Sequence, residues 1–245
     1  MTKRADRRPI GVFDSGVGGL TVLAELRRRL PDEATVYLGD NERAPYGPRP
    51  ADEVRQFTLE AVDWLLAQDP KLLVLACNTA TARALDDVRV RSGVPVVGVV
   101  RPGAVAAAAA TRTGAVSVIA TAGTVESGAY HDAIVEASPD TTVVQLACPE
   151  LVPMVEAGIL EGRRAESILR AYLEPLPDAN SGVDTLLLGC THYPLLREPI
   201  VEIVGPSVAV VDSAFTTSLA VEDLLDVLGS RAPAGGPAAS RLTSY

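Results

Sequence analysis

Two cysteines in this chain each follow an apolar segment and precede two small polar residues. The first stands in KLLVLACNTA at 71–80, and the second stands in TLLLGCTHYP at 185–194. The side chains after each cysteine supply amide, hydroxyl and imidazole groups, which can hold a small zwitterion by hydrogen bonds. If the two thiols face each other across a substrate, one thiolate can remove a proton while the other thiol returns a proton to the opposite face. Such a reaction inverts a stereocentre.

This chemistry makes a demand on the site, because a proton next to a carboxylate is very weakly acidic and a free thiol has a pKa of about 8.5. The site must stabilise a carbanion-like state and tune both thiols, for which nearby acids and an imidazole are suitable groups. The alternative for an unpaired cysteine is a small buried hydrophobe. We assign that role to Cys148, since Pro149 follows it instead of a polar pair.

The segment DSGVGG at 14–19 places three glycines directly before a predicted helix. Backbone N–H groups there could hold an anion, which the helix dipole would favour. The pattern departs from a nucleotide-binding fingerprint, because Thr21 stands where a third glycine is expected and no Gly-Lys-Ser/Thr follows. A substrate carboxylate and a tight turn without a ligand are both compatible with it.

Cofactor and metal chemistry lack the residues that they would need. Pyridoxal phosphate requires a lysine for its Schiff base, and the two lysines are Lys3 in a basic tail and Lys71 at the start of a strand. The two histidines are His131 and His192, and no CxxC occurs, so a zinc site is not supported. We therefore expect neither a cofactor nor a metal ion.

The composition is typical of a globular protein, with 245 residues of which 47% are apolar and 22% are charged. A net charge of -9 leaves no basic stripe, so we expect neither nucleic acid nor a membrane as a partner. The longest apolar stretch, PGAVAAAAAT, is too short to span a bilayer, and the basic MTKRADRR segment reads as a solvated extension without a secretory signal. We expect the protein in the cytoplasm, with reduced cysteines.

Eight short apolar runs are predicted to be buried strands, and most of the stretches between them have helical spacing. The runs are residues 10–13, 35–39, 72–77, 95–100, 116–121, 142–147, 185–190 and 208–212. This alternation predicts an α/β fold with parallel sheets flanked by helices. Ligands gather at the carboxyl ends of such strands, which is where the candidate residues stand.

The order of these pieces repeats along the chain. The series VFDSG, TVYLGD, VLACNTA and VPVVGV is echoed by VIATAG, TVVQLAC, LLGCTHYP and VAVVDS. We interpret the repeat as two similar lobes, with two unrelated α/β units as the alternative. The first lobe is predicted to comprise residues 1–98 and 207–245, ending in a helix and a mobile tail, and the second lobe residues 99–206.

Seven segments match a known group of enzymes in their order: VFDSGVGGLTV, YLGDNERAPYG, LACNTATA, ATAGTVESGAY, ACPELVPMVEAG, LGCTHYPLL and VVDSA. On these motifs the chain resembles the cofactor-independent glutamate racemases of the aspartate/glutamate racemase family. The resemblance implies two α/β lobes with the active site in the cleft between them, and interconversion of L- and D-glutamate. It also implies a role in peptidoglycan synthesis, and so in cell shape, and a homodimer.

The resemblance also implies roles for individual residues. Cys77 would act as the base on D-glutamate and Cys190 as the base on L-glutamate. Asp14 would assist Cys77, while His192 and Glu156 would assist Cys190. The implied substrate contacts are Asp14, Ser15, Tyr46, Gly47, Asn78, Thr79, Thr121, Thr191 and His192.

The chain departs from the family pattern at Arg101 and at Asn41-Glu42, both expected to lie beside the site. These departures leave substrate preference open, so a racemase for aspartate or another small amino acid is an alternative. A regulatory protein that binds an amino acid without turnover is another.

Some residues have interpretations that involve no substrate. Tyr46 could simply pack a turn, and His131 is expected at the surface or against a partner. Asp40 and Asp212 are interpreted as turn or helix-capping residues.

Overall fold

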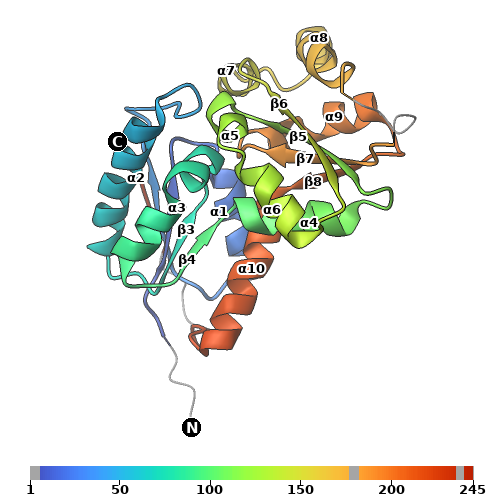
Figure 1. The fold of residues 1–245 in the computed structure, drawn as a ribbon. Helices are drawn as coiled ribbons and strands as arrows, with labels where there is room; N and C mark the ends of the chain where they lie inside the picture. The colour runs from blue at the N-terminus through green and yellow to red at the C-terminus, as the bar shows by residue number, and fades with distance from the viewer. Residues whose placement is uncertain (1–5, 177–181, 236–239, 245) are drawn as a thin grey trace.

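The computed structural model describes residues 6–176, 182–235 and 240–244, and it holds two parallel sheets flanked by helices (Figure 1). The strands of the first sheet are β1 Ile10–Asp14, β2 Thr35–Gly39, β3 Leu72–Leu75, β4 Val96–Gly98 and β9 Ser240–Ser244. The strands of the second sheet are β5 Ala115–Ala120, β6 Thr142–Ala147, β7 Thr185–Gly189 and β8 Ala209–Asp212. All eight predicted strands are present, which confirms the predicted fold class.

The two sheets have the same strand order. The first runs β4-β3-β1-β2 with β9 outside β2, and the second runs β8-β7-β5-β6. The strands that precede Cys77 and Cys190, β3 and β7, therefore occupy equivalent places beside the central strands β1 and β5. This equivalence confirms the repeat of similar lobes that the sequence indicated.

The fourth strand of the second sheet corrects one predicted boundary. Residues 208–212 were expected to return to the first lobe, but β8 pairs in parallel with β7, with Val210 opposite Leu186. In the second sheet, β8 therefore occupies the position that β4 occupies in the first. The crossing from the first lobe to the second after residue 98 stays a prediction.

The C-terminal segment corrects a second expectation. A mobile tail was predicted, yet residues 240–244 form β9, which pairs in parallel with β2 and sets Leu242 opposite Tyr37. Without this strand, β2 would be an edge strand with unpaired N–H and C=O groups. Residues 236–239 and 245 lie outside the described part of the chain, as do residues 1–5 of the basic N-terminal segment.

Helices cover both faces of each sheet. They are α1 Leu20–Arg29, α2 Ala51–Leu66, α3 Asn78–Ser92, α4 Val100–Ala110, α5 Ala122–Glu126, α6 Ala129–Ala137, α7 Leu151–Glu156, α8 Gly162–Leu173, α9 Arg197–Val204 and α10 Ser213–Leu228, with a 3-10 helix at Tyr193–Leu196. Their buried residues recur every three or four positions, as Val54, Thr58, Ala61 and Leu65 do in α2, so one side of each helix is buried.

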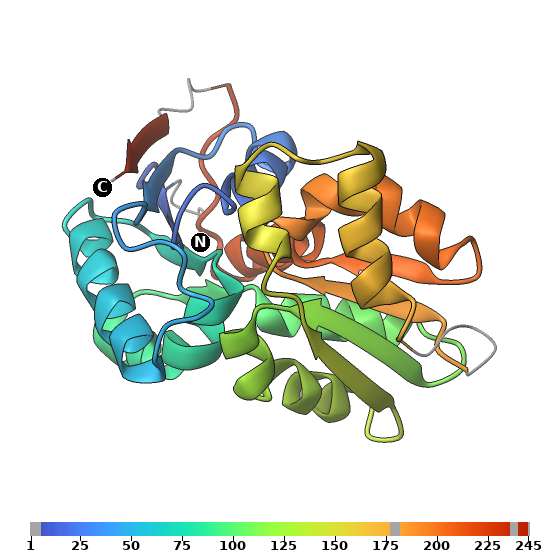
Figure 2. The ribbon, with the colours of Figure 1, turned by 90° about the horizontal axis from the view of Figure 1, so that it is seen from above.

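In the first lobe, α1 and α10 share one apolar cluster with the sheet, while α2 and α3 share another on the opposite face. In the second lobe, α4 and α6 cover one face, and α7, α8 and α9 cover the other. Figure 2 shows the two lobes side by side. Helix α10 packs against both α1 and α4, so it ties one lobe to the other. Within the described residues, no helix is both long enough and apolar enough to cross a membrane.

Candidate active site

The carboxyl ends of β1, β3, β5 and β7 bring the candidate residues together between the lobes. Asp14 ends β1, Cys77 follows β3, Thr121 follows β5 and Cys190 follows β7. Cys77 and Cys190 are both 5% exposed, and Asp14 is fully buried. Ligands of parallel α/β sheets bind at this edge, so the positions agree with a shared site.

Cys77 caps the N-terminus of α3. Its Sγ accepts a hydrogen bond from the backbone N–H of Ala80 at 3.4 Å and lies 3.3 Å from Ser15 Oγ. Burial, and then the negative charge of Asp14, raise the pKa of the Cys77 thiol to about 11, although these two hydrogen bonds act in the opposite direction. The helix N-terminus favours the thiolate, while the buried surroundings favour the thiol.

Cys190 has a different set of neighbours. Its Sγ lies 3.8 Å from His192 Nδ1, and His192 Nε2 lies 3.2 Å from Glu156 Oε1. Burial raises the pKa of the Cys190 thiol, which the His192 backbone opposes, while negative charge on Cys77, Asp14 or Glu156 raises it further. The three side chains form a chain from sulfur through imidazole to a carboxylate at the end of α7. His192 and Glu156 are thus both within reach of Cys190, the cysteine that they were expected to assist.

The glycine loop after β1 is built around Asp14. The N–H of Gly16 donates to Asp14 Oδ2 at 3.0 Å, and Tyr37 Oη donates to the carbonyl of Gly16 at 2.6 Å. Burial raises the pKa of the Asp14 carboxyl, while the charge of His192 and the N–H of Gly19 oppose that shift. The anion that these glycine N–H groups hold is therefore the chain's own carboxylate, which favours the tight-turn interpretation of DSGVGG.

The glycine loop and the first turn of α1 also contact the second lobe. Thr21 Oγ1 donates to the carbonyl of Thr191 at 3.0 Å, and Thr191 Oγ1 lies 3.4 Å from Asp14 Oδ1. A Cβ added at Gly18 would lie 2.4 Å from Thr191 Oγ1 and 2.5 Å from His192 Nδ1. Only a residue without a side chain fits at this point of the interface.

Three threonine hydroxyls meet where α3 faces α5. Thr79 Oγ1 lies 2.9 Å from Thr121 Oγ1 and 3.2 Å from Thr124 Oγ1, and the latter two are 3.0 Å apart. Thr79 belongs to the first lobe and the other two to the second. Thr124 was not among the predicted site residues. Its position one helical turn after Thr121, within ATAGT, is the sequence signal that could have identified it.

Three further predicted substrate contacts, Asn78, Gly47 and Tyr46, make hydrogen bonds within the protein. Asn78 accepts a hydrogen bond from Tyr130 Oη at 2.6 Å, and Tyr130 is a second residue that the sequence interpretation missed. Gly47 accepts a hydrogen bond from the N–H of Gly123 at 2.9 Å across the lobes. Tyr46 is 1% exposed, and its hydroxyl donates to Asp40, so its phenol is held within the turn.

Several other candidates lie away from the thiols. His131 is half exposed beside Asp132, and Arg101 pairs with Glu136 on the surface. Asp212 accepts hydrogen bonds from two N–H groups at the start of α10, which confirms its capping role. Cys148 is fully buried in the apolar cluster of the second lobe, as predicted.

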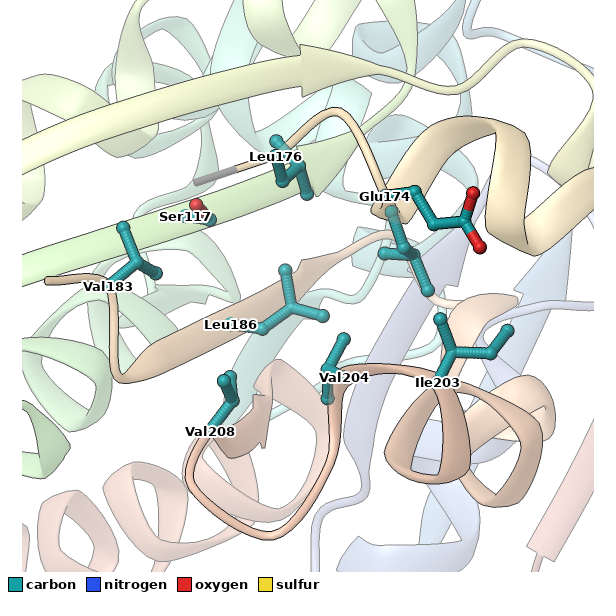
Figure 3. Close-up of a pocket in the computed structure, with 9 residues that line it drawn as sticks. Ser117, Glu174, Leu176, Val183, Leu186, Ile203, Val204 and Val208 are labelled. Atoms are coloured by element: carbon teal, nitrogen blue, oxygen red, sulfur yellow. The ribbon is translucent and has the colours of Figure 1, made fainter. Parts of the chain in front are cut away.

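A cavity of about 280 Å³ in the second lobe lies apart from these residues (Figure 3). Most of the residues that line it are apolar, with the side chains of Leu176, Val183, Leu186 and Val208 pointing into it, but Glu174 also lines it. Ser117 lines it with a buried hydroxyl that has no hydrogen-bond partner in the part of the chain that the structure describes. Among the described residues, no thiol or imidazole lines this cavity, so it does not hold the groups expected for proton transfer.

Within the described residues, no three His, Cys, Asp or Glu side chains are grouped as a metal site would require. Lys71 is buried against Glu33 with its side chain 1% exposed. The groups that surround the two cysteines are thus acids, hydroxyls, amides and one imidazole.

Comparison with known proteins agrees with this geometry. The family model described as Asp/Glu/Hydantoin racemase matches residues 14–220. The glutamate racemase of Oceanobacillus iheyensis is 51% identical over 220 residues, which cover 90% of this chain and 80% of that protein.

The crystal structure of glutamate racemase from Francisella tularensis in complex with D-glutamate is 33% identical, with a TM-score of 0.89 over 98% of this chain and 88% of that one. The glutamate racemase of Thermus thermophilus, in complex with beta-chloro-D-alanine, is 43% identical with a TM-score of 0.87, over 98% and 88% of the two chains. The match extends across both lobes and both cysteines, and the chain belongs to the aspartate/glutamate/hydantoin racemase family.

Proposed function

We propose that this protein interconverts L- and D-glutamate without a cofactor, using Cys77 and Cys190 as the two acid/base groups. The observation that carries the proposal is the pair of buried thiols at equivalent strand ends of two similar lobes, each with its own polar neighbours. The relatives reported above bear the name glutamate racemase, and one of them was solved with D-glutamate. The activity is that of an isomerase.

In the proposed reaction, the Cys77 thiolate takes the proton from Cα of D-glutamate. The C–H bond breaks, an S–H bond forms, and the electron pair stays on Cα, where it is delocalised into the α-carboxylate. The Cys190 thiol then gives its proton to the opposite face, which yields L-glutamate and a Cys190 thiolate. In the other direction the two cysteines exchange roles.

The assisting residues act on the two thiols differently. Asp14 lies beside the loop that carries Ser15 and would assist Cys77. His192, held by Glu156, would stabilise the thiolate of Cys190 when it forms. The proposed substrate contacts are Asp14, Ser15, Tyr46, Gly47, Asn78, Thr79, Thr121, Thr191 and His192. The hydroxyl and amide donors among them would stabilise the negative charge that develops on the carboxylate.

The test is racemisation of each glutamate enantiomer by the purified protein with no cofactor added, followed by circular dichroism. In D2O, the product should carry deuterium at Cα. A parallel panel with aspartate and other small amino acids separates the proposed substrate from the alternative ones. Absence of turnover on every member, together with tight binding of one of them, would instead favour the regulatory protein.

The raised pKa values of the thiols predict how activity depends on pH. Because burial raises the pKa of the Cys77 thiol to about 11, the thiolate is a minor species at neutral pH and its share grows tenfold with each pH unit. We expect kcat/KM for D-glutamate to rise by close to tenfold per unit from about pH 6.5 to 8.5. A plateau in kcat/KM that begins below about pH 8 would contradict a raised pKa of the buried Cys77 thiol.

Gly18→Ala is expected to lower kcat/KM by roughly tenfold to a hundredfold, because overpacking costs about 1–3 kcal/mol. The new methyl group would have to displace Thr191 and His192 where the lobes meet. Gly16→Ala, in the same loop, is the matched control, since the nearest atom to its Cβ would be Asn41 Oδ1 at 3.4 Å. Steady-state kinetics on both variants checks the prediction, and equal losses would argue against steric interference at the interface.

The cellular setting is also a proposal. D-glutamate made here would serve peptidoglycan synthesis, and a reducing cytoplasm would keep both catalytic cysteines as free thiols. We propose a homodimer, as the resemblance implies, which size-exclusion chromatography with light scattering would test.

A further inference from the structure

Tyr130 joins the apolar core of the second lobe to a residue of the first lobe. Its ring belongs to the cluster that contains Val118, Ile134 and Leu187, and the whole residue is buried. Its hydroxyl leaves that cluster and donates to Asn78 Oδ1 at 2.6 Å. Asn78 is the first residue of α3 and directly follows Cys77. One side chain therefore links the apolar cluster under α4 and α6 to the residue that follows Cys77.

Two glycines leave room for the Tyr130 ring. A Cβ added at Gly189, the residue before Cys190, would lie 2.9 Å from Tyr130 Cε2. A Cβ added at Gly103 in α4 would lie 3.5 Å from Tyr130 Cε1. The ring is thus held closely between β7 and α4, which fixes the direction in which its hydroxyl points.

This hydrogen bond has a consequence for the Asn78 amide. The amide offers one acceptor oxygen and one NH2 group with two donors, and Tyr130 uses the oxygen. Asn78 is 3% exposed, and its Nδ2 has no hydrogen-bond partner among the described residues. A buried donor without a partner is costly, and such a group in a native site calls for an explanation such as a ligand.

We infer that Tyr130 is a positioning residue that holds the Asn78 amide with its N–H groups toward the carboxylate of an amino-acid substrate. With the amide reversed, the Asn78 oxygen would face that carboxylate and repel it. Because the two residues belong to different lobes, the amide is held in this way only while the lobes keep the arrangement seen here. The inference rests on the proposed function and names the part that Tyr130 takes in it.

Burial raises the pKa of Tyr130, although a hydrogen bond from Ser213 opposes the shift. The phenol therefore stays protonated through the neutral range and keeps a hydrogen to donate to Asn78. The hydrogen bond to the amide oxygen does not depend on pH there.

The test is a double-mutant cycle with Tyr130→Phe and Asn78→Ala, measured in KM, kcat and the free energy of unfolding. Tyr130→Phe should raise KM for both glutamate enantiomers about tenfold while kcat changes less than about threefold. In the Asn78→Ala background, Tyr130→Phe should have almost no further effect on KM. Independent, multiplying effects on KM would overturn the inference.

Asn78→Asp separates positioning from a structural role. Its carboxylate would still accept the hydrogen bond from Tyr130, but it lacks donors and carries a charge that repels the substrate. We expect KM to rise more than tenfold, whereas a hydrogen bond with only a structural role would leave KM unchanged. Tyr193→Phe is the matched control, since Tyr193 is equally buried and donates to the Cys148 carbonyl at 3.1 Å. Its effect on KM should be independent of Asn78.

Failure of the proposed function is distinguishable from failure of this inference. If the unaltered protein racemises no glutamate, the proposed function fails. The double-mutant cycle, measured in the free energy of unfolding, then still shows whether Tyr130 and Asn78 are coupled. Additive unfolding energies for Tyr130→Phe and Asn78→Ala overturn the inference whatever the substrate is. Non-additive unfolding energies together with a coupled effect on KM support it.

Discussion

Cys77→Ser and Cys190→Ser should each lower kcat for racemisation by about 1,000-fold or more, because general acid/base groups contribute about 10²–10⁴ each and a serine hydroxyl ionises far less readily than a thiol. Both cysteines are required in both directions, since one removes a proton and the other supplies one. The loss should therefore be the same whether the reaction starts from L- or D-glutamate. Circular dichroism of both reactions measures it.

The two variants should differ in the exchange that remains. In Cys77→Ser, Cys190 can still remove the proton of L-glutamate, so deuterium from D2O should enter L-glutamate without conversion to the D form. In Cys190→Ser, deuterium should enter D-glutamate alone. Proton NMR of the recovered amino acid distinguishes these patterns.

Cys148→Ser is the control for these variants, because Cys148 is buried in the apolar cluster of the second lobe. It should lose stability but keep kcat within a small factor. Full racemase activity in either catalytic-cysteine variant would disprove the two-thiol mechanism.

Lys71→Met is expected to lower the free energy of unfolding by about 3–5 kcal/mol, the usual cost of leaving one partner of a buried ion pair alone. Lys71 Nζ lies against Glu33 Oε2, with the two side chains only 1% and 3% exposed. The ammonium also donates to the carbonyls of Asp6 and Ser230, both at 2.8 Å. It thereby holds the backbone at Asp6 and at Ser230 against the first lobe.

Replacing both partners should be much less harmful than replacing one. In Lys71→Met combined with Glu33→Leu, no buried charge remains, so most of the lost stability should return. Some loss should persist, because Glu33 Oε1 accepts a hydrogen bond from the N–H of Ala232 at 2.8 Å. Urea unfolding of the single and double variants measures this difference.

The exposed pair Arg28–Glu25 is the control for the buried one, with side chains 60% and 30% exposed. Arg28→Ala should change the free energy of unfolding by less than about 1 kcal/mol. If Lys71→Met cost no more than Arg28→Ala, the buried pair would not stabilise the fold as described.

The sequence predicted the fold class and the eight strands because those features depend on local apolar runs and on turn residues between them. The two cysteine motifs could be recognised for the same reason, since each joins a buried strand to its polar residues within ten positions. Asp212 as a helix cap and Cys148 as a buried hydrophobe were also local inferences. In each of these cases the neighbours that matter are close in sequence.

The errors concern strands whose partners are distant. The run at 208–212 looks alike whether it completes the first sheet or the second, and its pairing with β7 decided the matter. The segment at 240–244 follows Pro- and Gly-rich residues, and it became a strand because β2 offered an open edge. Hydrophobic pattern alone carries no information about which edge a strand will join.

The sequence by itself determined which chemical groups are present: two thiols at equivalent strand ends, an imidazole, and few lysines. The tertiary structure decided how those groups are tuned, because burial and charges from distant segments raise both thiol pKa values. It also decided that Thr124 joins Thr79, and that Tyr130 reaches Asn78 from the other lobe. These contacts exist only where two separately formed lobes meet, which no local stretch of residues can specify.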